Sequence, residues 1–206
     1  MIDHKNKIVF IHIPKTGGTS IENCFFPNYD EYLYLKYNKN KQKKGDVKHA
    51  DINNIIQLSG DISIEQLKNY FKFSVVRNPW DLVSSYFKYH NNILPGRFED
   101  IKNIFHPQTE QQKTFFNRWV QYQLRQQIDW LGSGNLISVD HIIRFENLQN
   151  DFNGMISKLG LVDLPPLSHT NKSNKKHYSE YYDDESIEIV YNHYKKDIEK
   201  FKYSYE

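Results

Sequence analysis

Residues 7–20, KIVFIHIPKTGGTS, contain the pattern that decides the fold. The stretch opens with a short run of β-branched and aromatic residues, which is typical of a strand buried on both faces. Pro14 ends this run, and Gly17 and Gly18 then allow a tight turn. A helix is expected to continue over residues 21–26. The order strand, glycine turn, helix predicts the opening unit of an α/β domain.

The rest of the sequence alternates between strand and helix patterns in the same way. Short apolar runs predict further strands over residues 73–76, 136–139 and 142–145. Periodic apolar positions predict helices over residues 63–71, 110–131, 148–159 and 185–201. This alternation indicates a three-layer, P-loop-like α/β domain with a mainly parallel central sheet flanked by helices. The length of 206 residues fits a single domain over residues 1–206.

Several helix ends carry recognisable signals. Ser63 and Gln66 form a capping-box pattern, and Asn78 followed by Pro79 and Asp81 is a typical helix start. The side chains predicted to face the core from the helices over residues 110–131 and 185–201 are Phe115, Phe116, Trp119 and Val120, and Ile187, Val190, Tyr191, Tyr194, Ile198 and Phe201.

Charge and cysteine content narrow the class of protein. A net charge of +2 is too small to indicate nucleic-acid binding through the electrostatic field alone. Cys24 is the only cysteine, so no internal disulfide is possible, and its apolar neighbours favour a core position. No apolar run approaches the ~20 residues that span a bilayer. The polar N-terminus does not resemble a secretory signal, so we expect a cytoplasmic protein.

The segment IPKTGGTS, residues 13–20, offers a cradle for an anion. Gly17 and Gly18 let backbone N–H groups approach a phosphate or sulfate closely, and the start of the helix adds positive potential. Further donors come from Lys15, Thr16, Thr19 and Ser20. The pattern differs from the Walker P-loop, G-x-x-x-x-G-K-[ST], because the lysine precedes the glycines.

The segment VVRNPWDLVSSYF, residues 75–87, repeats the order strand, turn, helix. Arg77 follows the strand, and its guanidinium can bind two oxygens of one phosphate. Taken alone, such an arginine would usually be a surface salt-bridge partner. Ser85 lies eight residues later on the helix, whereas Ser84 projects from a different helical face. Arg77 and Ser85 are therefore a candidate pair for a second phosphate.

The two motifs together resemble those of sulfotransferases that use 3′-phosphoadenosine 5′-phosphosulfate (PAPS) as donor and release 3′-phosphoadenosine 5′-phosphate (PAP). The strings HIPKTGGTS and RNPWDxxxS are similar to those of carbohydrate sulfotransferases and their bacterial relatives. The resemblance implies that Lys15 contacts the oxygen bridging phosphate and sulfate, and that Gly17, Gly18, Thr19 and Ser20 hold the 5′-phosphate, with Thr16 also among the donor-binding residues. It also implies that Arg77 and Ser85 bind the 3′-phosphate.

A base must accept the proton of the acceptor hydroxyl, and a histidine or a carboxylate suits this role. His49 lies between the two motifs, and the resemblance to heparan sulfotransferases implies that it is the catalytic base. A surface histidine beside a lysine-rich loop is the other interpretation. Glu22 is a weaker candidate base, and His12 is expected to be structural.

The C-terminal part extends the resemblance. The stretch containing Asn171, Lys172 and Ser173 is similar to one that follows the core of the bacterial branch, which implies that Lys172 and Ser173 close over the nucleotide. Arg144 and Glu146 fall in a family-like segment and are expected to be structural. The resemblance is weak over residues 28–48 and 91–127, the segments that would shape an acceptor pocket.

The resemblance implies in-line transfer of a sulfuryl group from PAPS to a hydroxyl of a glycan or glycoconjugate, without a metal ion. Two alternatives stay open. A nucleotide or small-molecule kinase also binds phosphates on a strand, loop and helix, although the position of Lys15 counts against it. A non-catalytic module that binds PAP would need only the two phosphate motifs. The sequence names neither the acceptor nor the oligomeric state.

Overall fold

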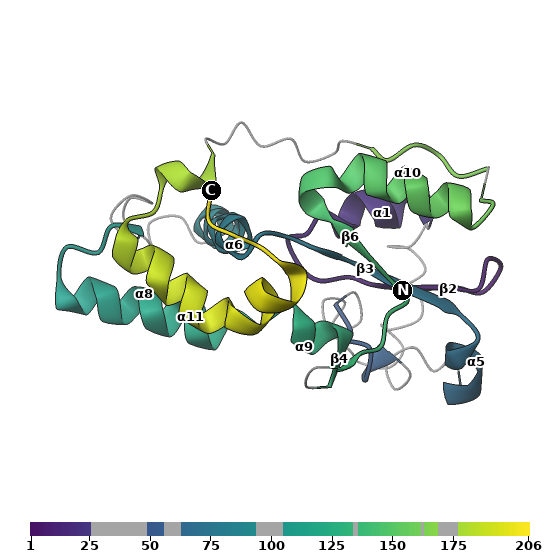
Figure 1. The fold of residues 1–206 in the computed structure, drawn as a ribbon, viewed down its shortest axis with the longest axis horizontal. Coiled ribbons are helices and arrows are strands. Elements are labelled where there is room, and N and C mark those ends of the chain that lie inside the picture. Colours follow the sequence, from purple (N-terminus) through teal and green to yellow (C-terminus); the bar gives the residue numbers. More distant parts are fainter. Residues whose placement is uncertain (26–48, 56–62, 94–104, 134–135, 162, 169–176) are drawn as a thin grey trace. The chain divides into compact units, whose positions relative to one another are not determined.

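The computed structural model describes residues 1–25, 49–55, 63–93, 105–133, 136–161, 163–168 and 177–206 (Figure 1). These residues form two compact units. The first unit contains Met1–Val76 and Ile128–Lys172, and the second contains Arg77–Gln127 and Ser173–Glu206. The single domain expected over residues 1–206 stays a prediction.

The first unit is built on a sheet of four strands in the order β1-β2-β3-β6. The strands are β1 (Ile2–Asp3), β2 (Ile8–Ile11), β3 (Phe71–Val76) and β6 (His141–Arg144). β2 and β6 both run parallel to β3, and only β1 is antiparallel to its neighbour within this sheet. The prediction of a mainly parallel sheet is confirmed.

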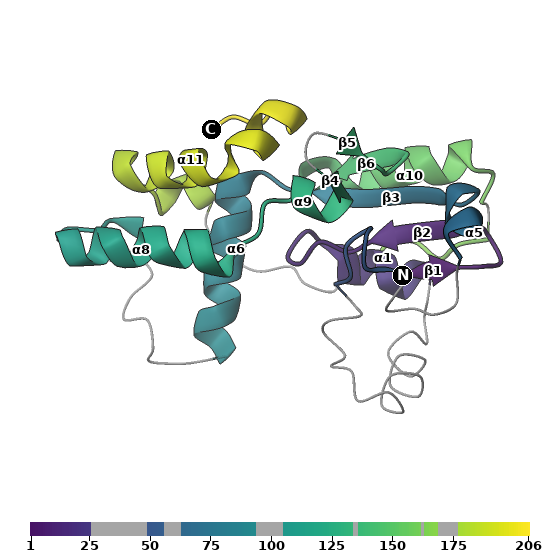
Figure 2. The ribbon, with the colours of Figure 1, turned by 90° about the horizontal axis from the view of Figure 1, so that it is seen from below.

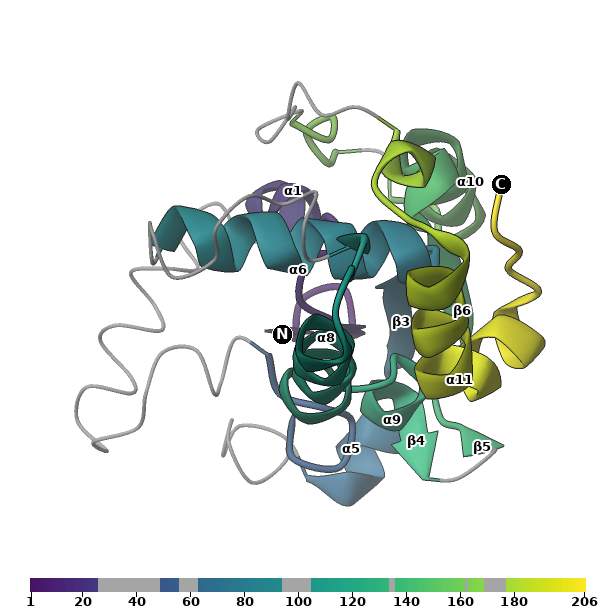
Figure 3. The ribbon, with the colours of Figure 1, turned by 90° about the vertical axis from the view of Figure 1, so that its left-hand side faces the viewer.

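Helices cover both faces of this sheet, which confirms the expected layers. α1 (Gly18–Phe25) and α10 (Leu148–Lys158) lie on one face, and α5 (Ile64–Lys68) and α9 (Ile128–Leu131) lie on the other (Figures 1 and 3). A short hairpin of β4 (Gly132–Ser133) and β5 (Leu136–Ile137) follows α9. A 3-10 turn, η2 (Phe145–Asn147), joins β6 to α10.

An aromatic core holds α1 and α10 against the sheet. Phe10 of β2 stacks on Phe73 of β3 with the ring centroids 4.9 Å apart. Phe25 of α1 meets Phe152 of α10 edge to face at 5.9 Å. All four rings are buried, so the carboxyl end of β2 and the start of α1 rest on a closely packed base.

The described residues of the second unit form mainly three helices and a short turn. α11 (Asp184–Phe201) packs against both α6 (Pro79–Ile93) and α8 (Glu110–Gln123), which lie beside it in Figure 2. η3 (Tyr178–Glu180) precedes α11 and contacts α6. Capping boxes formed by Thr109 with Gln112, and by Asp183 with Ser186, fix where α8 and α11 begin.

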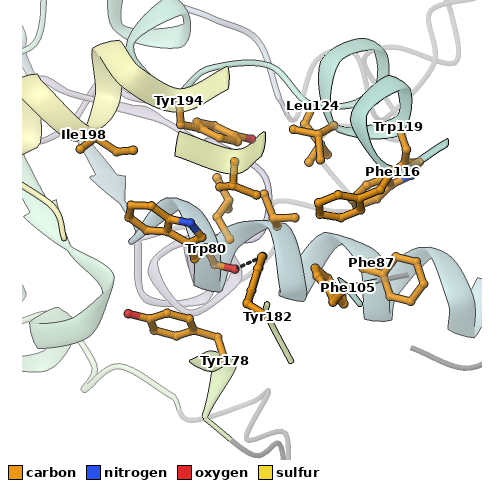
Figure 4. Packing of buried hydrophobic residues seen from close by; sticks show 14 residues of the cluster. Trp80, Phe87, Phe105, Phe116, Trp119, Leu124, Tyr178, Tyr182, Tyr194 and Ile198 are labelled. Atoms are coloured by element: carbon orange, nitrogen blue, oxygen red, sulfur yellow. Dashed lines mark hydrogen bonds between the residues drawn. The ribbon is translucent and has the colours of Figure 1, made fainter. Parts of the chain in front are cut away.

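Aromatic side chains also fill the core of the second unit (Figure 4). The buried indole of Trp80 donates to the carbonyl of Ile187 at 3.1 Å, and its own carbonyl accepts from the Tyr182 hydroxyl at 2.8 Å. Burial raises the pKa of Tyr182 well above its ordinary value, because the charged phenolate would be desolvated. These bonds hold the start of α6 against α11.

Two predicted helices end early. The helix expected over residues 63–71 has the predicted capping box at Ser63, but it ends at Lys68, because Phe71 joins β3 opposite Ile8. The helix expected over residues 110–131 breaks at Leu124, whose backbone is extended, and resumes as α9. The early ends have one cause, which is that tertiary pairing overrides a locally helical pattern.

Other expectations are corrected in detail. Phe115 and Tyr191, expected to face the core, are 46% and 39% exposed. α6 extends from Pro79 to Ile93. Residues 28–48 and 94–104 lie outside the described residues.

Candidate functional site

The chain turns sharply between β2 and α1. Lys15 and Gly17 both have left-handed backbones, with φ of +66° and +84°. Glycine adopts this conformation without strain, whereas lysine does so at a cost. Thr16 is fully buried, and its hydroxyl donates to the carbonyl of Ile13 at 2.8 Å. This bond holds the turn that presents Lys15.

α1 begins earlier than the sequence pattern suggests. Gly18, Thr19 and Ser20 belong to its first turn, and the N–H group of Ser20 donates to the carbonyl of Gly17 at 3.1 Å. Backbone N–H groups in the first turn of a helix point away from the helix and favour a negative charge at its start. The loop therefore leads directly into the first turn of α1, and its role as an anion cradle stays a prediction.

Gly18 is required by its neighbour His12. A Cβ atom at position 18 would lie 2.8 Å from Cγ of the His12 ring and would overlap Cδ2 and Nε2. The imidazole thus lies directly against the first residue of α1. No larger residue fits at position 18 unless His12 moves.

His12 belongs to a polar cluster with buried Glu22 and half-buried His49. His12 Nδ1 and Glu22 Oε1 are 2.6 Å apart, and both side chains are 4% exposed. The rings of His12 and His49 meet edge to face with their centroids 4.5 Å apart. The structure thus brings His49 to the residue that borders the loop, although 37 positions separate His12 and His49 in the sequence.

One contact of His49 indicates which of its ring nitrogens carries the hydrogen in the neutral form. His49 Nδ1 lies 3.2 Å from the carbonyl oxygen of His12. A carbonyl oxygen can only accept, so Nδ1 carries the hydrogen and a neutral ring has its lone pair on Nε2. That nitrogen can accept a proton. Glu22, the alternative base, is buried and paired with His12.

Arg77 opens the second unit and is buried. Its Nε and Nη2 atoms donate to Oδ2 of Asp81 at 2.8 and 2.7 Å. The predicted helix start is confirmed, because Asn78 Oδ1 accepts the N–H of Trp80 at 3.1 Å and α6 begins at Pro79. The motif therefore contains the carboxylate of Asp81, which lies one turn into the helix and fixes the direction of the guanidinium.

The two serines of the motif differ in their surroundings. Ser84 is buried, and its hydroxyl donates to the carbonyl of Asp81 at 2.9 Å inside the helix. Ser85 is half-buried. Because the Ser84 proton is used within α6, Ser85 is the better candidate for an external ligand, and its role stays a prediction.

Comparison with known proteins gives the family. A model of the family described as "Sulfotransferase family" matches residues 1–204, nearly the whole chain. The chain belongs to the sulfotransferase family. Searches of curated proteins and of solved structures found no match. Family membership makes this protein a transferase that moves a sulfuryl group to a hydroxyl-bearing acceptor, and it gives no support to the kinase alternative.

The roles predicted for Lys172 and Ser173 in this sulfotransferase stay predictions, because both residues lie outside the described residues. Among the residues that the structure describes, no group of three or more His, Cys, Asp or Glu side chains could hold a metal ion. In the same part of the chain, no helix is both long and apolar enough to cross a bilayer. The cytoplasmic location also stays a prediction.

Sequence reasoning missed the residues that hold this sulfotransferase's motifs in place. Asp81 was expected only as a helix-start residue, although its spacing of four from Arg77 was a visible signal for an ion pair. Gln127 bonds the backbone of Arg77 across 50 positions, and no local pattern marks it. The contact between Gly18 and His12 was equally invisible.

Proposed function

We propose that this sulfotransferase uses PAPS as donor and acts on a hydroxyl of a carbohydrate. The observation that carries the proposal is the place of the two motifs along the chain. One follows β2, and Arg77 is the residue after Val76, the end of β3. β2 and β3 are neighbouring parallel strands, and ligands of such sheets bind at the carboxyl ends of the strands.

The proposed donor contacts follow the motifs. Lys15 and the first turn of α1 bind the 5′-phosphosulfate, and Arg77 with Ser85 binds the 3′-phosphate. The full set of proposed donor-binding residues is Lys15, Thr16, Gly17, Gly18, Thr19, Ser20, Arg77, Ser85, Lys172 and Ser173. Cations and N–H groups are sufficient to neutralise the donor's charges, so the proposed site has no metal.

The proposed reaction is a single in-line displacement. The acceptor hydroxyl gives its proton to Nε2 of His49 while its oxygen forms a bond to sulfur. The bond from sulfur to the bridging oxygen breaks, and the electron pair stays on the phosphate of PAP. Lys15 stabilises the charge that grows on that oxygen, an interaction that is stronger in the transition state than in the ground state.

Calorimetric titration with PAP and AMP tests the donor assignment, because the two ligands differ by the 3′-phosphate. We expect clear preference for PAP. Arg77→Ala should weaken PAP binding about ten- to a hundred-fold, since a hydrogen bond to a charged group contributes about 1.5–3 kcal/mol. Ser85→Ala should cost less. Equal affinity of the unmutated protein for PAP and AMP would remove the PAPS assignment.

Turnover of PAPS over a panel of glycans tests the acceptor class. Transfer to a sugar hydroxyl supports the proposal. Transfer only to non-carbohydrate hydroxyls would overturn the acceptor class and leave the donor standing. Binding of PAP with no transfer to any hydroxyl would favour the non-catalytic module.

A further inference from the structure

One side chain holds the backbone of Arg77 at both polar atoms. Oε1 of Gln127 accepts the N–H of Arg77 at 2.8 Å, and Nε2 of Gln127 donates to the Arg77 carbonyl at 2.8 Å. Gln127 is fully buried. A side-chain amide offers one donor group and one acceptor in a plane, so it pairs with a peptide unit as a neighbouring strand would.

Gln127 is itself held in place by the last helix. Its backbone N–H donates to Oδ2 of Asp197 at 2.7 Å, and Asp197 is fully buried on α11. Gln127 lies in the break between α8 and α9, where no helical bond would otherwise fix its direction. The helix α11 thus supports Arg77 through Gln127, and all three residues belong to the second unit.

The side chain of Arg77 is fixed separately from its backbone. Both of its bonds to Asp81 end on the same carboxylate oxygen, Oδ2, and the Arg77 side chain is 4% exposed. A guanidinium binds a phosphate best when its plane and direction are already set, because little freedom is then lost on binding. Arg77 meets this condition through two independent supports.

We propose that Gln127 is a positioning residue that sets the selectivity of this protein for a 3′-phosphorylated nucleotide. The inference rests on the proposed function, in which Arg77 binds the 3′-phosphate. Displacement of the Arg77 backbone moves the guanidinium away from its productive direction, and a shift of about 0.5 Å is enough to weaken such a site. Gln127 acts through Arg77 and needs no contact with the nucleotide.

The decisive variant is Gln127→Glu, with PAP and AMP affinities measured at pH 8. The ionised carboxylate keeps an acceptor for the Arg77 N–H but turns an oxygen toward the Arg77 carbonyl, where the amide donated. We expect PAP affinity to fall about ten-fold and AMP affinity to stay within about two-fold. Gln121→Glu is the matched control, because it makes the same exchange at an exposed position of α8 in the same unit.

Acidification adds a second readout. A protonated carboxyl offers a donor and an acceptor, as the amide does, so lowering the pH should restore the PAP preference of Q127E relative to the unmutated protein. The double variant R77A/Q127E should show the same ratio of PAP to AMP affinity as R77A alone, because the effect passes through Arg77. Additive losses would overturn the inference.

Two further variants keep the test decisive. If Q127E does not fold, Gln127→Met removes both bonds without adding a charge, and the same fall in PAP preference is expected. Asp81→Asn removes a negative charge beside Arg77. The change of charge alone would raise PAP affinity, whereas loss of the positioning of the Arg77 guanidinium would lower PAP affinity. We expect PAP affinity to fall.

The outcomes separate this inference from the proposed function. Equal binding of PAP and AMP by the unmutated protein would remove both. A PAP preference that R77A abolishes, but that Q127E and Q127M retain, would overturn the role of Gln127 alone. A fall in AMP affinity equal to the fall in PAP affinity would show general damage to the fold, which also overturns a specific positioning role.

Discussion

Replacing Gly18 with alanine tests the packing of His12 beneath the start of α1. The added Cβ would lie 2.8 Å from Cγ of His12 and closer to two other ring atoms. His12 has little room to yield, because its ring stacks on Phe10 at 5.6 Å and its Nδ1 is bonded to Glu22 at 2.6 Å. Either the overlap stays or the buried bond to Glu22 breaks.

Each route has a known cost. Overpacking of a rigid core costs about 1–3 kcal/mol, and loss of a hydrogen bond to a charged group costs about 1.5–3 kcal/mol. The less costly route sets the loss, so Gly18→Ala should lower the free energy of unfolding by about 1–3 kcal/mol. Denaturant unfolding followed by circular dichroism measures this change.

Gly154→Ala is the matched control, because it makes the same exchange in a helix of the same unit. A Cβ at position 154 meets no atom within 4 Å. Alanine favours a helix interior over glycine by about 0.8–1.0 kcal/mol, so this variant should be more stable than the unmutated protein. The double variant H12A/G18A should lose less stability than the sum of the single losses, since the obstacle is gone. If Gly18→Ala were as stable as Gly154→Ala, His12 would not be fixed against α1.

Three further outcomes are expected. Lys15→Ala should lower the turnover rate of PAPS far more than it lowers donor affinity, and near-normal turnover would remove Lys15 from the mechanism. His49→Ala should abolish transfer but leave PAP binding intact. The rate of the unmutated protein should fall as the pH drops below about 6.5, where an imidazole takes up a proton. An active variant with an unchanged pH profile would contradict this role of His49. Burial raises the pKa of the Cys24 thiol to about 11 from 9.0, so alkylation of the folded protein should be slow at pH 8, and rapid labelling there would contradict the buried position. Burial favours the neutral thiol, so the contribution of Cys24 to the free energy of unfolding is fully present below about pH 9. It is lost as the pH rises towards 11, the pKa of the thiol in the folded protein.

The parts of the fold that the sequence predicts are those set by local chemistry. β2 was recognisable because a strand buried on both faces needs a continuous apolar run. The start of α6 was recognisable because Asn78 accepts an N–H of the first helical turn and Pro79 needs no partner there, and both signals are local in the sequence. Such signals depend on neighbours within about four positions, so they can be recognised in the sequence whatever the tertiary structure.

The parts that the sequence does not predict depend on partners far along the chain. The helical pattern over residues 110–131 hides the break at Leu124, because Gln127 is fixed there by Asp197, 70 positions away. Phe115 was expected inside since an aromatic residue favours burial, but the core of the second unit is already filled by Phe116 and Trp119. Long-range contacts of this kind produce no periodic pattern in the sequence.

The two supports of Arg77 show that its position depends on more than the short motif. Asp81 is part of the motif and directs the guanidinium wherever the motif forms a helix start. The backbone is held by Gln127, which reaches its place only when α11 has packed and Asp197 is buried. A buried peptide group that loses its partner costs about 1–3 kcal/mol, so the folded second unit penalises any displacement of Arg77. If Arg77 binds the 3′-phosphate as proposed, selectivity for that phosphate is a property of the packed unit, and a peptide that carries only the motif should bind PAP and AMP with little difference.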